Sequence, residues 1–372
     1  MAMVRKGTIQ LPLHPGHAPQ WLVKRMSKLS YAISKLLIEE HGQHEFLRRM
    51  SDPLWFQAFG CVLGFDWHSS GLTTVVTGVL KQSLKPDVHG VMLAGGKGSK
   101  GVNTKHDIAN ISETFGLSEN KRNELLYASR ISAKIDNAAV QDGYTLYHHT
   151  FFLAEDGSWA VVQQGMNPDN RMARRYHWLA DSIESFVNEP HTGIISDRAS
   201  EQTLDMTSTL SEECRKTCVD IVNSNPSNVI SSIQRLPIKD SLDQWIGNKP
   251  SVEAYAMPWH LDWGLFRRVY DIRPRNYEEL IAIKGVGPTA VRALALVAEL
   301  IYNARPSWED PVKFSFAHGG KDGVPYPVDR NVYDKTIKIL MEAIEGAAIE
   351  RESRLKALRR LAVYAKNFIL PD

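Results

Sequence analysis

Two polar stretches interrupt the apolar pattern of the chain with side chains suited to acid–base or metal chemistry. Asp66 and His68 stand two residues apart in "GFDWHSSGLTT", where they could hold a Mg or Mn ion or act as acid and base. Gln164 and His149 lie in two strand-like runs, and only one of His148 and His149 can face a given site because consecutive strand residues point to opposite faces. We therefore predict Asp66, His68, His149 and Gln164 as catalytic candidates. Helix capping by the serines after His68 is the alternative for the first stretch.

A glycine-rich stretch, "AGGKGSKG" at 94–101, adds two lysines to this set. Loops of this kind expose backbone N–H groups to a phosphate, and Lys97 and Lys100 would add positive charge. The spacing is not that of a nucleotide-binding P-loop, so it does not favour a nucleotide triphosphatase. We expect a phosphate contact here, with a flexible basic loop as the alternative.

A second glycine pair lies near the C-terminus, in "NYEELIAIKGVGPTAVRALALVAEL". Asn276 can cap a helix whose third residue is Glu279. Gly285 and Gly287 then allow a tight turn, and Pro288 can open the next helix because its missing N–H is not needed there. The segment therefore predicts two helices joined by a glycine turn.

This segment resembles the helix-hairpin-helix motif, with the core of that motif at Ile283, Gly285, Val286 and Gly287. The resemblance implies that N–H groups at the start of the second helix hold a DNA phosphate, in agreement with the partial positive charge of a helix N-terminus. An ordinary pair of helices with a glycine turn is the alternative. The predicted phosphate-binding residues are Lys284, Gly285, Val286, Gly287 and Thr289.

About forty residues further on, "PVDRNV" is similar to a pattern in base-excision glycosylases of the same hairpin superfamily. There an aspartate stabilises a cationic sugar or activates the nucleophile, and the resemblance gives that role to Asp329. Bifunctional members carry a lysine where this chain has Thr289. A helix N-cap is the alternative function of Asp329.

The central stretch "DGSWAVVQQGMNPDNRMARRYHW" resembles the ParB/sulfiredoxin type of fold, in which a strand leads to a glycine and an arginine-rich helix start. The resemblance implies that Arg171, Arg174 and Arg175 bind phosphates after Gly165. We accordingly expect a polar helix from about 170 to 188, and some members of that fold are nucleases.

Around these motifs, the 372 residues and 43% apolar content predict a globular chain of more than one domain. Residues 1–250 read as a mixed α+β body, with a strand hairpin around Glu155–Gly157, and 251–372 as an all-helical domain. Three cysteines do not make a disulfide framework, and no membrane span or signal segment is evident, which predicts a cytoplasmic protein. The net charge of +2 excludes a polycation but not local basic patches.

Most of the chain is similar to a family of archaeal and bacterial proteins of unassigned function that ends in a helix-hairpin-helix. The phrases "YHHTF", "ARRYHWL" and "FSFAHGGKDG" carry that likeness. It implies a role in DNA repair. We expect a DNA-processing protein, with metal-dependent cleavage of single-stranded or structured DNA as the first hypothesis. A glycosylase that uses Asp329 and a non-enzymatic DNA-binding module are the alternatives.

Overall fold

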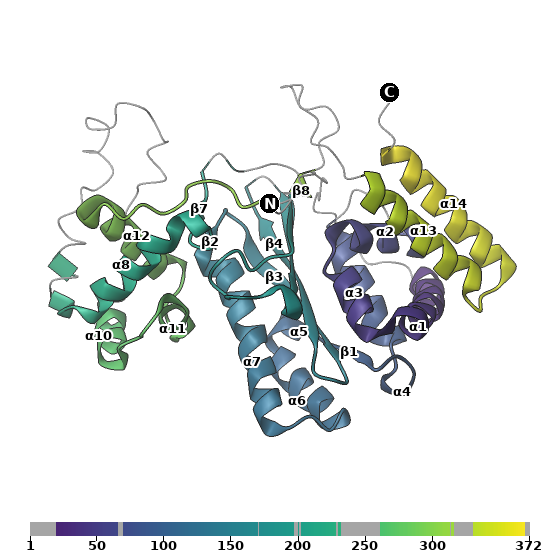
Figure 1. Ribbon diagram of the computed structural model, residues 1–372, viewed down its shortest axis with the longest axis horizontal. Helices are drawn as coiled ribbons and strands as arrows, with labels where there is room; N and C mark the ends of the chain where they lie inside the picture. Colours follow the sequence, from purple (N-terminus) through teal and green to yellow (C-terminus); the bar gives the residue numbers. More distant parts are fainter. Residues whose placement is uncertain are drawn as a thin grey trace.

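A central sheet separates two groups of helices in the computed structural model of the protein (Figure 1). The structure describes residues 20–65, 70–169, 171–196, 200, 202–227, 230–231, 261–312, 314–315 and 330–368. The strands are β1 (Val91–Lys97), β2 (Val140–Gln141), β3 (Thr145–Ala154), β4 (Trp159–Asn167), β5 (Met172–Leu179), β6 (Gly193–Ser196), β7 (Leu204–Asp205) and β8 (Phe314–Ser315).

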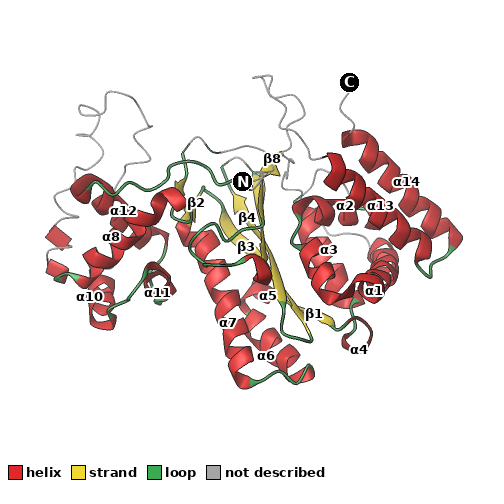
Figure 2. Cartoon of the chain, in the orientation of Figure 1, coloured by secondary structure: helices red, strands yellow, loops and turns green. Residues whose placement is uncertain are grey.

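Helices cover both sides of this sheet (Figure 2). One side carries α6 (Thr104–Thr114), α7 (Glu119–Lys134), a π-helical turn (Ile135–Ala139), α8 (Glu212–Asn223), α10 (Trp263–Ile272), α11 (Tyr277–Ala282) and α12 (Pro288–Tyr302). The other side carries α1 (Gln20–Met50), α2 (Pro53–Leu63), α3 (Gly71–Ser83), α13 (Arg330–Gly346) and α14 (Arg351–Phe368). Two short helices, α4 (Pro86–His89) and α5 (Ser99–Val102), flank β1.

The larger sheet has the strand order β1-β3-β4-β5-β6-β8, and β2 pairs with β7 in a separate small ladder. Neighbours from β1 to β6 are antiparallel, whereas β8 lies parallel to β6. The tight connection of β3 to β4 has Gly157 at φ 84°, a conformation that favours glycine. This confirms the predicted strand hairpin, and the architecture confirms the α+β class.

The alternation of side chains along the strands divides the core into two parts. Phe151 and Leu153 pack toward α7 and α12, while Phe152 and Ala154 pack toward α1 and α3. All four side chains are fully buried. Because successive strand residues point to opposite faces, one apolar run on β3 supplies both layers.

The two cores do not follow the predicted division at residue 250. Cys214 and Cys218 of α8 belong to the same buried cluster as Leu294 of α12. In contrast, Leu340 of α13 and Leu361 of α14 pack with the N-terminal helices on the opposite side of the sheet. The C-terminal third of the chain therefore contributes to both layers, and β8 extends the sheet itself.

The predicted polar helix at about 170–188 is wrong. The chain turns after Asn167 and returns as β5, which pairs with β4 over its whole length. Asn167, Pro168 and Asp169 are turn-forming residues, and Tyr176 and Trp178 favour strands, so the signal was present but was outweighed by the charged residues. The strand-to-helix step that the ParB/sulfiredoxin likeness required is therefore absent here.

Candidate nucleic-acid interface

The hairpin between α11 and α12 is built from local capping interactions. Asn276 Oδ1 accepts the N–H of Glu279 at 2.8 Å, which confirms the predicted N-cap. Gly285 has φ 98°, and the N–H of Val286 closes the turn onto the carbonyl of Ile283 at 3.2 Å. Val286 is 1% exposed, so its side chain anchors the turn in the core.

The residues on either side of Val286 reach the surface. Gly285 and Thr289 are exposed and Gly287 is half-buried. Within the described part of the chain, no acceptor pairs with the N–H groups of these three residues. They lie at the N-terminal end of α12, a helix of 15 residues, where the peptide dipoles favour an anion. The turn therefore offers a set of open donors.

Positive side chains from three elements surround the turn. Lys284 belongs to the turn and is exposed. Lys134 reaches it from α7 and donates to the carbonyl of Ile283 at 2.6 Å. Arg268 of α10 lies so close that a Cβ at Gly285 would be 3.7 Å from its guanidinium. Lys134 and Arg268 were not predicted from the sequence, because only the packing of α7 and α10 brings them here.

The positive charge around the turn depends on the protonation of Lys134. Burial lowers the pKa of its ammonium group to about 8, and the nearby charge of Arg130 acts in the same direction. Arg268 stays paired with Asp262 at 3.0 Å on the surface, an interaction that water screens strongly. At neutral pH the turn is therefore flanked by cations and carries no carboxylate of its own.

The glycine-rich segment forms the end of β1 and the start of α5, and it also presents its lysines to solvent. Gly95, Gly96 and Gly98 all have positive φ, so the backbone path requires glycine. Lys97 and Lys100 are exposed, and Lys97 Nζ lies 5.9 Å from the ring centroid of Tyr147. Both lysines are thus accessible to an anionic ligand, as the predicted phosphate contact would need.

Gln164, by contrast, is fully buried in a row of polar side chains beneath α3. It pairs in the sheet between His148 and Arg175, and its amide donates to the carbonyl of Ser70 at 2.9 Å and to the hydroxyl of Tyr147. Thr73 of α3 donates to its side-chain oxygen. Gln164 therefore joins the sheet to the start of α3, and its hydrogen bonds are already used within the protein.

His148 of the same row is held as a neutral imidazole. Its Nε2 lies 2.8 Å from the hydroxyl of Thr150 and 3.1 Å from that of Thr77. Burial lowers the pKa of His148 to about 3, and the charge of Lys97 acts in the same direction. Its Nδ1 is buried without a hydrogen-bond partner among the described residues.

His149 belongs to a second polar network on the opposite face of the sheet, so the structure separates it from Gln164. His149 Nε2 lies 2.8 Å from Ser129 Oγ, and its Nδ1 lies 2.9 Å from Gln163 Oε1. Gln163 donates to Asp136 at 2.7 Å, and His191 lies 2.5 Å from the same carboxylate. Burial lowers the pKa of His149, which leaves a neutral ring. Each polar atom named here has a partner, so the network ties the π-helical turn to the sheet.

The structure does not support the predicted phosphate contacts of Arg174 and Arg175, because both side chains are buried. Both side chains are 0% exposed on β5. Arg174 pairs with Asp142 at 2.9 Å and with Asp310 at 2.7 Å. Of the three arginines predicted here, Arg171 alone is exposed.

Arg175 is buried without a carboxylate among its described contacts. It donates to His177 Nε2 at 2.9 Å and to Gln57 Oε1 at 3.1 Å, and its guanidinium lies 4.8 Å from the centroid of the Phe56 ring. Burial lowers the pKa of Arg175 to about 9. It supports the polar row from within the core and does not reach the surface.

Three predicted residues, Asp66, His68 and Asp329, lie outside the described residues. Across the ranges that the structure does describe, no group of three or more His, Cys, Asp or Glu side chains is arranged to hold a metal ion. In the same ranges no helix has both the length and the apolar character that crossing a membrane requires.

The fold and this surface define an α+β protein in which a helical hairpin with an open glycine turn is packed onto a mainly antiparallel sheet. The chain belongs to the family described as "Protein of unknown function (DUF763)", whose family model matches residues 7–328. That match includes the sheet and the hairpin. No curated protein and no solved structure matches the chain.

Proposed function

We propose that the protein binds DNA through the turn between α11 and α12, without sequence preference. The observation that supports this proposal is the set of open amides at Gly285, Gly287 and Thr289 at the start of α12, flanked by Lys284 and Lys134. Backbone amides and lysines of this kind bind phosphate oxygens and do not read bases. Since the DNA of a prokaryotic cell lies in its cytoplasm, a cytoplasmic location agrees with this proposal.

The test is the affinity of the Gly287→Val variant for a labelled duplex, measured by fluorescence anisotropy. Gly287 has φ −113°, which valine adopts, and a Cβ there would meet only the carbonyl of Gly285, at 3.9 Å. The variant should therefore fold normally while its side chain crowds the open amides. Loss of one or two charge-assisted hydrogen bonds predicts a Kd raised by about tenfold or more.

Gly78→Val provides the matched control. Gly78 lies on α3, across the sheet from the hairpin, and a Cβ there has nothing within 4 Å. This variant should bind duplex DNA like the unaltered protein. Equal affinity of the Gly287→Val and Gly78→Val variants would show that the turn does not contact DNA.

Metal-dependent cleavage of single-stranded or structured DNA is the second candidate function. Its support comes from the sequence, in which Asp66 and His68 are side chains that can hold a metal ion. Mg or Mn held by these two side chains would activate water and stabilise charge on the phosphate.

An incubation series on labelled flapped, single-stranded and duplex oligonucleotides tests this second proposal. Direct cutting with Mg or Mn that EDTA abolishes, and that Asp66→Asn removes, is the expected result. Cutting that appears only after alkali, is insensitive to EDTA and is lost in Asp329→Asn would instead identify a glycosylase. Intact substrates under every condition would leave DNA binding as the whole activity.

A further inference from the structure

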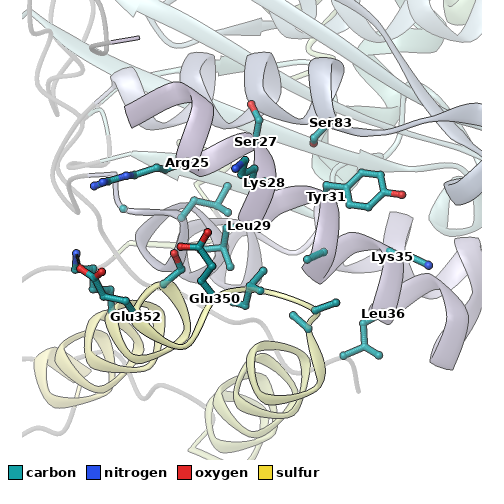
Figure 3. Close-up of a pocket in the computed structure, with 18 of the residues that line it drawn as sticks. Arg25, Ser27, Lys28, Leu29, Tyr31, Lys35, Leu36, Ser83, Glu350 and Glu352 are labelled. Atoms are coloured by element: carbon teal, nitrogen blue, oxygen red, sulfur yellow. Dashed lines mark hydrogen bonds and ion pairs between the residues drawn. The ribbon is translucent and has the colours of Figure 1, made fainter. Parts of the chain in front are cut away.

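A large groove lies between α1 and the α13–α14 pair, on the far side of the sheet from the hairpin (Figure 3). Its cavity volume is about 1230 Å³. Gly346 lets α13 approach α1 closely, because a Cβ at this position would lie 2.6 Å from the side chain of Leu36. At one end Gly64 leaves room for the Arg360 guanidinium, which donates to the carbonyl of Val62 at 3.2 Å. We call this cavity the α1–α14 groove.

Cationic side chains predominate along the α1–α14 groove. The described residues that line it include six lysines and arginines and three glutamates. Two of the glutamates are already paired with lysines, Glu39 with Lys35 and Glu352 with Lys356. Four further cations form no ion pair within 4.0 Å with a carboxylate in the described part of the chain, although Lys356, and to a lesser extent the charge of Arg25, lowers the pKa of Glu352, and they are Arg25, Lys28, Lys85 and Arg360.

An aromatic side chain stands at the edge of this charged surface. Trp21 is 60% exposed, which is unusual for the largest apolar side chain, and it lines the groove. The guanidinium of Arg25 lies 5.4 Å from its ring centroid, so one face of the indole carries a cation. Tyr31 lines the same wall about three helical turns further along α1.

We propose that the α1–α14 groove binds single-stranded DNA. Unpaired cations along a groove match the sugar–phosphate backbone, and an exposed indole offers a stacking surface for a base. The cavity exceeds the ~300–1,000 Å³ of ordinary small-molecule pockets, which favours an extended polymer as the occupant. The α1–α14 groove and the duplex-binding turn of the proposed function have only DNA as a ligand in common, and they lie on opposite sides of the sheet.

The test is binding of a labelled oligo(dT) 12-mer to the full chain, followed by anisotropy. Trp21→Ala should raise Kd about tenfold, since one stacked base contributes that much, and Trp21→Phe should recover most of the affinity. Lys28→Glu should weaken binding and reduce the slope of log Kd against log salt by about 0.7, the value for one phosphate contact on a single strand.

Three controls make the result specific to the α1–α14 groove. Lys105→Glu alters an exposed lysine on α6, on the other side of the sheet, and should leave the affinity for oligo(dT) unchanged. Gly287→Val should also leave it unchanged, so failure of the duplex contact and failure of the groove can be told apart. Thermal unfolding of each variant shows whether it is folded.

Unchanged oligo(dT) binding in both Trp21→Ala and Lys28→Glu would overturn the proposal. So would a glutamate-rich peptide that binds with the same dependence on Trp21, because the occupant would then be an acidic protein. Oligo(U) binding more than tenfold tighter than oligo(dT) would overturn it in favour of RNA.

Discussion

Replacing Arg174 by methionine tests whether the arginines of β5 are structural or bind phosphate. Arg174 joins three parts of the chain, because Asp142 follows β2 and Asp310 lies beyond α12. Its guanidinium also lies 4.6 Å from the ring centroid of Tyr144. Burial by itself lowers the pKa of Arg174, but the two carboxylates raise it above its ordinary value, so the side chain remains charged. Methionine keeps the apolar stem and removes the charge.

The size of the effect follows from what the two carboxylates retain. Removing one partner of a buried ion pair costs about 3–5 kcal/mol, because the other charge stays buried. Asp142 keeps hydrogen bonds from the Tyr176 hydroxyl at 2.7 Å and the Tyr144 N–H at 3.0 Å. Asp310 keeps the N–H of Val312 at 3.0 Å. We therefore expect a loss near the lower end, about 3 kcal/mol of unfolding free energy.

Urea unfolding followed by tryptophan fluorescence measures this loss. With a slope of about 1–3 kcal/mol per molar urea, the midpoint should fall by on the order of 1 M. Arg171→Met is the control, because Arg171 is exposed in the β4–β5 turn and should change the unfolding free energy by less than about 0.5 kcal/mol. An Arg174→Met variant with the midpoint of the unaltered protein, but with weakened DNA binding, would refute the structural role and restore the phosphate-binding interpretation.

Two further predictions concern the hairpin. Lys134 loses its proton in the folded protein as the pH rises through about 8, so duplex affinity should fall by about fivefold to tenfold between pH 7 and 9, and Lys134→Arg should abolish this dependence. The unfolded chain keeps that proton to higher pH, so the loss of the proton from Lys134 raises the free energy of unfolding over the same pH range. Unfolding therefore cannot explain the lower affinity for duplex DNA. Identical pH profiles for the unaltered protein and Lys134→Arg would contradict the assignment of the pH dependence to Lys134. Gly285→Val should lower the melting temperature more than Gly287→Val does, because Gly285 has φ 98° and a Cβ there would lie 3.1 Å from Leu265; equal melting temperatures would contradict this.

The local elements were largely predictable because short-range chemistry specifies them. The hairpin turn of β3 and β4 follows from Gly157, and the start of α11 follows from Asn276 and Glu279. Within α1 the helical path is interrupted at Gly42, which has φ 79° and ψ 168°, and it resumes to Met50. The glycine marks the irregularity, and Phe46, Leu47 and Met50 beyond it are buried in the core.

The candidate interface was only half predictable. Local sequence indicated the glycine turn and Lys284, but Lys134 and Arg268 are 150 and 16 residues from Lys284 in the sequence and meet the turn through packing. The α1–α14 groove was not predicted, because it forms where helices from the two ends of the described chain come together.

The sequence alone determined which segments are helices and strands wherever periodicity and turn residues agree, and it determined that the α11–α12 turn can expose its amides. Only the tertiary structure decided which charges face water. Arg174 and Arg171 are three residues apart, yet one is buried between two carboxylates and the other is exposed. The physical reason is that a buried charge needs partners, and Asp142 and Asp310 become its partners only when distant parts of the chain meet at β5.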